Sequence, residues 1–265
     1  MDITIPQTYE ELNEQQRGAL CRILLTLDNT EETPLRIIKV LISHLPNRTQ
    51  QQLLQEVPFT TLWQYAEPFL STEKLYHFPP LSLGEVVGNC RVSEQGVSSP
   101  APRLANLTIK QFSVADSIYY RLRLSQYKDE LLLRQLVASL YNLPDTPFDV
   151  LNLPQVAEHT DKAAITTAYE VAFAYTCCRE YIISRFPKVF TAKDDKKDTK
   201  DEGSSFVFRN SSLKSYTPFS KIISVMAMDK HQPLGNWHQC NATRVYDFFE
   251  VLTESILQAE QKEKK

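Results

Sequence analysis

Residues 162–186, KAAITTAYEVAFAYTCCREYIISRF, form the longest apolar run in this chain. No glycine or proline interrupts the run before Pro187, which cannot continue a helix. Apolar side chains would fall on all sides of such a helix, which is typical of a helix buried in a core or in a membrane. Glu170 in its middle would be costly at bilayer depth, so the run predicts a buried core helix. Asp161 is expected to cap its first turn.

Several other segments carry helix-start signals or helical spacing of apolar residues. Asn13 can cap a helix that begins at Glu14, and Thr33-Pro34 places a proline at a first helical position. Thr108 and Gln111 fit a capping box. The predicted fold class is therefore mainly α, a multi-helix bundle around the central buried helix. The other helices are expected at about 14–27, 33–45, 49–56, 60–67, 108–122, 129–141, 154–159, 218–228 and 243–261.

Two segments interrupt the helical pattern. Residues 71–103 show no sustained period, and a short β-hairpin could form within them near 82–92, around Gly88-Asn89. Residues 191–205, TAKDDKKDTKDEGSS, cannot bury apolar surface and predict a charged flexible linker. The predicted organisation begins with an N-terminal helical region (1–70) and an irregular connection (71–103). A central helical bundle (104–190) and the charged linker (191–205) follow. The last part is a C-terminal helical segment (206–265) that packs on the bundle.

Composition argues against several classes of function. The net charge of -3 gives no basic face for nucleic acid. Only 6 glycines occur in 265 residues, and the chain has no Walker A or Gly-x-Gly-x-x-Gly loop for phosphate. The start, MDITIPQTYEE, lacks the basic and apolar regions of a signal peptide. Five scattered cysteines are typical of reduced thiols, so we expect a cytoplasmic location.

The sequence offers no catalytic, cofactor-binding or metal-binding residues that we would select. His231, His238 and Cys240 lie close together, but a structural zinc site would need four ligands at paired spacings. Cys177 and Cys178 fall among apolar neighbours on a helix, where thiols are inert. We therefore expect no enzyme activity and no cofactor.

Aromatic side chains are the remaining candidates for a functional surface. Tyrosine and tryptophan are common anchors of protein interfaces. Trp237 follows a Pro-Gly turn and is the preferred contact residue, although aromatic clusters on helices are more often part of a core. The candidate protein-interaction residues are Trp63, Tyr65, Tyr119, Tyr120 and Trp237.

Three short segments carry a resemblance to a known family. They are IPQTYEEL at 5–12, LTIKQF at 107–112 and SVMAMDKHQPLGN at 224–236, the last followed by a terminal amphipathic helix. Together they resemble proteins encoded among the tail genes of phages and prophages of Bacteroidetes-type bacteria, which look like tail-assembly chaperones. The resemblance implies a helical protein without catalytic residues that holds tape-measure or tail-tube subunits. It implies a location in the host cytoplasm during assembly, with the virion as a second location. The linker at 191–205 departs from the family pattern.

Three hypotheses of function follow. The first is a non-enzymatic tail-assembly or virion-associated protein that binds protein partners through helical surfaces. The second is an intracellular helical adaptor or regulatory protein unrelated to phage. The third is an enzyme whose site is assembled only in space, which perturbed titratable groups in one pocket would support. An exposed apolar surface would favour the first two.

Overall fold

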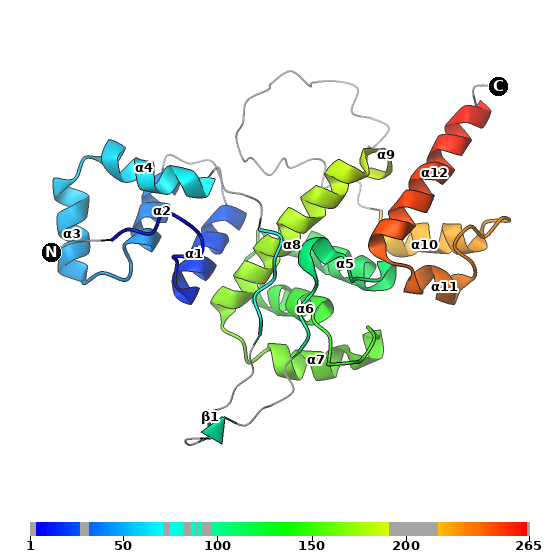
Figure 1. Cartoon of the computed structure of the whole chain (residues 1–265), viewed down its shortest axis with the longest axis horizontal. Helices are drawn as coiled ribbons and strands as arrows, with labels where there is room; N and C mark the ends of the chain where they lie inside the picture. The colour runs from blue at the N-terminus through cyan, green and yellow to red at the C-terminus, as the bar shows by residue number, and fades with distance from the viewer. Residues whose placement is uncertain are drawn as a thin grey trace.

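The described part of the chain is mainly α-helical and contains about twelve helices (Figure 1). The computed structural model describes residues 4–26, 32–70, 75–81, 86–87, 90–91, 97–190 and 217–263. The predicted fold class is therefore correct, although the helices are more numerous and several are shorter than expected. The charged segment at 191–205 lies outside the described residues, so its prediction as a linker is not tested.

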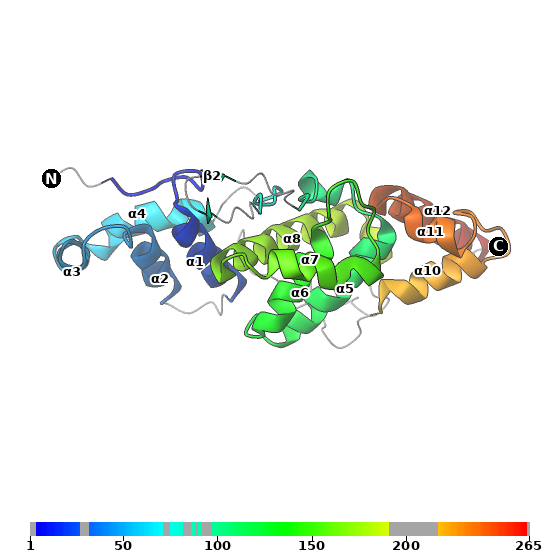
Figure 2. The ribbon, with the colours of Figure 1, turned by 90° about the horizontal axis from the view of Figure 1, so that it is seen from below.

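The helices form three groups arranged in a row (Figure 2). The first group lies at the N-terminal end, the second in the middle and the third at the C-terminal end. The first contains α1 (Glu14–Leu25), α2 (Thr33–Leu41), α3 (Asn47–Glu56) and α4 (Phe59–Leu70). The second contains α5 (Ile109–Leu124), α6 (Glu130–Leu140), α7 (Leu153–Thr160), α8 (Ile165–Arg185) and α9 (Pro187–Phe190), with 3-10 turns at Pro102–Leu104 and Val150–Asn152. The third contains α10 (Phe219–Met228), α11 (Trp237–Ala242) and α12 (Val245–Glu263).

The β content of the described ranges is a minimal strand pair. β1 (Val86–Val87) and β2 (Cys90–Arg91) pair antiparallel, with Val86 opposite Arg91. The residues around these strands lie outside the described ranges, so the rest of the expected hairpin cannot be followed. The fold in the described ranges therefore contains no larger sheet.

Helix α8 runs through the middle group and also contacts α1 of the first group. Residues 170–178 of α8 are buried without interruption, whereas its first and last turns are partly exposed. The expected cap is wrong: Asp161 ends α7, and α8 begins after Ala164 with no side-chain cap. Pro154 lies in the first turn of α7, and that helix reaches Thr160, so Asp161 falls at a helix C-terminus.

Two buried glutamines tie neighbouring helices together. Gln16 stands in the capping box that Asn13 makes at the start of α1, and its side chain donates to the carbonyls of Val40 and Leu41 at the end of α2. Gln111 lies at the equivalent place in α5, after the Thr108 cap, and donates to the carbonyls of α6. Each amide thus satisfies carbonyls that the end of a helix leaves without partners.

The third group is joined to the middle one through the start of α5. Thr108 and Arg244 form an isolated antiparallel bridge, in which the Ile109 amide donates to the Thr243 carbonyl. Beside it, Phe112 packs edge-on against Phe219 and Phe249. The predicted helices at 218–228 and 243–261 correspond to α10 and α12. Among the described residues, none of the helices has the length and apolar content needed to span a bilayer.

Candidate functional site

Helix α1 crosses α8 at close range near Gly18. A β-carbon at this position would lie 2.5 Å from the backbone oxygen of Thr166, so only glycine fits the crossing. One turn away, the Thr167 hydroxyl donates to Glu14 Oε1 at 2.9 Å, which fixes the register of the two helices. The close approach brings charged side chains of α1 against the buried middle of α8.

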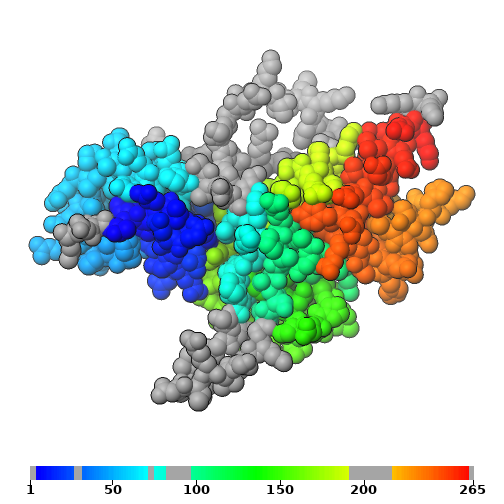
Figure 3. Space-filling model, viewed as in Figure 1, coloured from blue at the N-terminus to red at the C-terminus, as the bar shows by residue number. Residues whose placement is uncertain are grey.

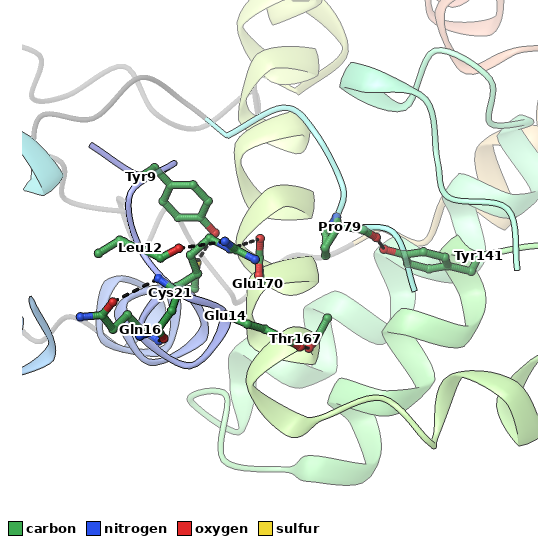
Figure 4. A network of polar contacts seen from close by, with 11 residues as sticks. Tyr9, Leu12, Glu14, Gln16, Cys21, Pro79, Tyr141, Thr167 and Glu170 are labelled. Carbon is green, nitrogen blue, oxygen red and sulfur yellow. Dashed lines mark hydrogen bonds and ion pairs between the residues drawn. The ribbon is translucent and has the colours of Figure 1, made fainter. Parts of the chain in front are cut away.

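An ion pair joins the two helices at this crossing (Figure 4). Arg17 Nε lies 3.4 Å from Glu170 Oε1, and the two side chains are 29% and 7% exposed. Arg17 also donates through Nη1 to the Leu12 carbonyl at 2.9 Å. Within the described residues, Glu170 Oε2 is buried and has no hydrogen-bond partner. A buried oxygen without a partner is costly, and Asp116 Oδ2 on α5 is in the same state.

Tyr9 and Cys21 close the inner side of the ion pair. The Tyr9 hydroxyl lies 3.5 Å from the Cys21 sulfur, and the Tyr9 side chain points toward Glu170 in Figure 4. Burial raises the pKa of the Cys21 thiol well above its ordinary value. This cysteine is therefore a protonated core residue at neutral pH and not a nucleophile.

Glu170 has a perturbed carboxyl group. Burial raises its pKa, while the charge of Arg17 and the nearby Tyr9 hydroxyl act in the opposite direction. Glu14 adds a smaller upward effect, because a second carboxylate disfavours ionisation of the first. A carboxyl group with a raised pKa in a partly enclosed site is typical of functional sites.

A pocket of about 320 Å³ opens beside the ion pair. One wall is apolar and comes from Pro79, Pro80 and Leu81, and Tyr141 fixes this wall by donating to the Pro79 carbonyl at 2.6 Å. The opposite wall comes from α1 and from the start of α8. Charged and polar groups gather on it: Glu14, Arg17, Lys162, Thr167 and Glu170, with Ala163 and Ala164 between them.

The pocket is small, and charged groups of both signs line it. Its volume is at the lower end of the range for small-molecule sites, about 300 to 1,000 Å³. Two carboxylates and two cations line it, so a ligand with a single charge has no net electrostatic advantage. Glu170 could act as a general acid or base, but nothing in the pocket identifies a nucleophile or a reaction. No cluster of histidine, cysteine or acidic residues suited to a metal ion occurs within the described ranges.

The candidate interaction residues of the sequence lie elsewhere and do not meet at one site. Trp63 and Tyr65 are half-buried on α4 and pack against the core. Tyr120 is half-buried on α5. Trp237 begins α11 and is 45% exposed, so it is the candidate best placed to touch a partner.

Tyr119 is a core residue, and its assignment to a contact surface is wrong. Its side chain is 3% exposed and packs against the ring of Tyr175, with ring centroids 5.0 Å apart. Tyr127 donates a hydrogen bond to its hydroxyl at 3.2 Å. The hydroxyl thus finds a partner inside the core, which removes the usual reason for a tyrosine to stay at the surface.

The pocket itself was not found from the sequence. Glu170 was recognised only as a charge that argues against a membrane span, and Glu14 only as a first-turn residue. The available signal was the acidic residue in the middle of an otherwise apolar helix, since such a residue needs a partner or a function. Its partner, Arg17, lies on another helix, and no local pattern links the two.

No family model, no curated protein and no solved structure matches this chain.

Proposed function

We propose that this chain is a non-enzymatic protein that binds protein partners through helical surfaces. The observation that carries the proposal is a set of apolar side chains on the third helical group. Met228 and Val225 on α10 are 82% and 69% exposed, and Trp237 stands at the start of α11. We call these three residues the α10–α11 patch.

The geometry of the patch suits recognition of another helix or an extended apolar segment. Val225 and Met228 are three positions apart, so both lie on one face of α10. The opposite face of α10 is buried through Phe219, Ile223 and Met226. Helix α10 lies at the outer edge of the molecule, where a partner can reach it (Figure 3).

The two helices of the patch are held as one unit. They contact one another, and the Cys240 thiol of α11 lies 3.9 Å from the Ile223 carbonyl of α10. Asn236 caps α11 with a capping box, which fixes the position of Trp237 at its first turn. A rigid apolar surface loses little conformational entropy on binding.

The setting proposed for this binding is phage tail assembly, with tape-measure or tail-tube subunits as partners. It rests on the resemblance of residues 5–12, 107–112 and 224–236 to tail-assembly proteins. Residues 224–236 overlap the α10–α11 patch, since they contain Val225 and Met228 and end just before Trp237. An adaptor role unrelated to phage is the alternative.

A pull-down with the full chain from its own cells tests the proposal, with bound proteins identified by mass spectrometry. We expect wild type to recover a long tape-measure-like protein or tail-tube subunits, and the double variant Val225→Glu, Met228→Glu to lose them. Leu131→Glu is the matched control, because Leu131 is an exposed apolar residue of α6, outside the patch. Patch-dependent recovery of cellular proteins would favour the adaptor. Recovery that is equal in the double variant would exclude the patch as the binding surface.

A further inference from the structure

Arg103 has an unusual main-chain conformation. Its φ of 58° and ψ of 20° are left-handed, and the next residue, Leu104, has a φ of 62°. Residues with a β-carbon rarely adopt this conformation, and such strain gathers at functional sites. Two hydrogen bonds hold Arg103 in place. Its amide donates to the Tyr76 carbonyl at 3.1 Å, and its carbonyl accepts from the Tyr246 hydroxyl at 2.7 Å. Glycine would adopt the conformation without strain, so an arginine here indicates a role for its side chain.

Two tyrosine rings orient the exposed guanidinium group of Arg103. Its central carbon lies 5.1 Å from the ring centroid of Tyr76 and 4.7 Å from that of Tyr181. The two rings pack edge-on, with centroids 5.5 Å apart, and support the group from below. Stacking occupies the face of a guanidinium group and leaves its N–H donors at the edge. Among the described residues, none accepts a hydrogen bond from these donors and no carboxylate pairs with them, so they are available to an acceptor on another molecule.

A second exposed arginine lies beside the same tyrosines. Arg185 follows Tyr181 by four residues on α8, so both lie on one face of that helix. Its guanidinium carbon is 5.2 Å from the ring centroid of Tyr246, the residue whose hydroxyl donates to Arg103. Glu250 pairs with Arg185 at 3.2 Å, but both side chains are about half exposed, and such pairs contribute little stability. An acidic group from another molecule can therefore take the place of Glu250.

We call Arg103, Arg185, Tyr76, Tyr181 and Tyr246 the Arg–Tyr surface. Tyrosine and arginine are enriched among the residues that contribute most to protein–protein binding. A guanidinium group binds a carboxylate or a phosphate through paired hydrogen bonds. The net charge of -3 opposes an acidic partner, so attraction for such a partner has to come from local cations like these two.

We propose that the Arg–Tyr surface binds an acidic peptide segment of a partner protein. Arg103 is the anchor, because its donors have no acceptor among the described residues, and Arg185 binds a second acidic group in exchange for Glu250. Two sources share this oxyanion chemistry, a run of acidic side chains and a phosphorylated side chain. The surface shares no residue with the α10–α11 patch, so either proposal can fail without the other.

Fluorescence anisotropy of labelled peptides, titrated with the full chain, tests the proposal. Three peptides share a glycine–serine frame: the first carries three central glutamates, the second a central phosphoserine and the third three central glutamines. We expect saturable binding of the glutamate or the phosphoserine peptide and no saturable binding of the glutamine peptide. Tighter binding of the glutamate peptide would identify carboxylates as the natural groups, and tighter binding of the phosphoserine peptide a phosphate.

Variants show whether the binding occurs on this surface. Arg103→Gln removes the charge and should weaken binding at least about tenfold, or about 1.4 kcal/mol. Arg185→Gln should weaken it less, because Glu250 already competes for this arginine. Arg48→Gln is the matched control, since it removes the same charge from an exposed position of α3 and should bind as wild type does.

Arg103→Gly separates a binding role from a structural one. Glycine relieves the left-handed strain, so the thermal midpoint of this variant should be no lower than that of Arg103→Gln, while peptide binding is lost. A lower midpoint would overturn the proposal, because the position would then not be strained.

Three further results would overturn the proposal. The first is no saturable binding of either acidic peptide by folded wild-type protein at millimolar concentration. The second is equal binding by Arg103→Gln and wild type. The third is a loss of binding in Arg48→Gln as large as that in Arg103→Gln, because then the overall charge and not this surface would attract the peptide.

Discussion

Two buried carboxylates of this protein each pair with an arginine, and the two pairs differ in geometry. Asp116 of α5 is fully buried and accepts from Arg179 Nε at 2.5 Å. Tyr175 adds a second hydrogen bond to the same oxygen at 3.3 Å. Glu170 of α8, by contrast, is 3.4 Å from Arg17, and it faces a pocket.

The two pairs also differ in the balance between burial and the partner's charge. Burial alone would lower the pKa of Arg179, but the charge and hydrogen bond of Asp116 outweigh it and raise that pKa. Burial dominates at Glu170, where Arg17 only partly offsets it. Each carboxylate keeps one buried oxygen without a hydrogen-bond partner among the described residues, so the pairs differ in how closely the arginine approaches the other oxygen.

The largest effect is expected for Asp116→Ala. The substitution leaves Arg179 without its carboxylate in a place where its side chain is only 19% exposed. Breaking one side of a buried pair typically costs about 3–5 kcal/mol. Urea denaturation should show this loss, and Glu170→Ala should cost clearly less, because Arg17 is more exposed and keeps its bond to the Leu12 carbonyl. Equal losses would mean that the two pairs are energetically alike.

Gly18→Ala tests whether the close crossing of α1 and α8 holds the second pair in place. An alanine would be favourable by about 1 kcal/mol in a free helix. Here its β-carbon meets the Thr166 backbone, so we expect a net loss of roughly 1–3 kcal/mol in unfolding free energy. Gln15→Ala, at an exposed position of the same helix, is the control and should change little. Stabilisation by Gly18→Ala would show that the helices separate easily.

A smaller effect is expected in the pH dependence of stability. Burial raises the folded-state pKa of Glu170 above its unfolded value. This group therefore favours folding below the unfolded pKa, and that contribution is lost as the pH rises through the folded pKa. Relative to Glu170→Gln, wild type should lose stability as the pH rises above the ordinary carboxyl range. Urea midpoints of both proteins across these pH values measure the effect. If the difference between the two urea midpoints stayed constant with pH, Arg17 would fully offset the cost of burying the Glu170 charge.

The smallest effect belongs to an exposed pair. Lys188 of α9 lies 3.0 Å from Glu260 of α12, and both side chains are more than two-fifths exposed. Exposed ion pairs contribute only about 0–1 kcal/mol. Glu260→Gln should therefore leave the thermal midpoint nearly unchanged. A loss as large as that of Asp116→Ala would contradict the ranking by burial on which the comparison depends.

Local signals predicted several helix boundaries well. Asn13 caps α1, Pro34 lies at the start of α2, and Thr108 accepts the Gln111 amide at the start of α5. These features involve atoms within four residues of each other, so the sequence specifies them directly. The prediction for Asp161 is wrong because a short polar residue between two helical segments can lie at the end of the first or at the start of the second. Helix α7 extends to Thr160, so Asp161 lies at the end of α7.

The aromatic candidates show the limit of residue type as a guide to exposure. Tyr119 and Tyr120 are adjacent, yet one is buried in the core and the other is half-exposed. Their helix turns by about 100° per residue, so neighbours face different directions. Only the packing of Tyr127 and Tyr175 against α5 determines which tyrosine is enclosed.

The sequence by itself determined that the chain is mainly α-helical and where many of its helices begin, because capping and helical periodicity are local. The tertiary structure alone decided which charges meet. Glu14 and Thr167 are 153 positions apart, and they touch only because α1 docks on α8 at Gly18. The ion pair of Arg17 with Glu170 depends on the same docking, whereas the hydrogen bond from Tyr141 to the Pro79 carbonyl places the opposite wall of the pocket. Contacts between distant segments follow from the packing of whole helices, and no short stretch of sequence encodes them.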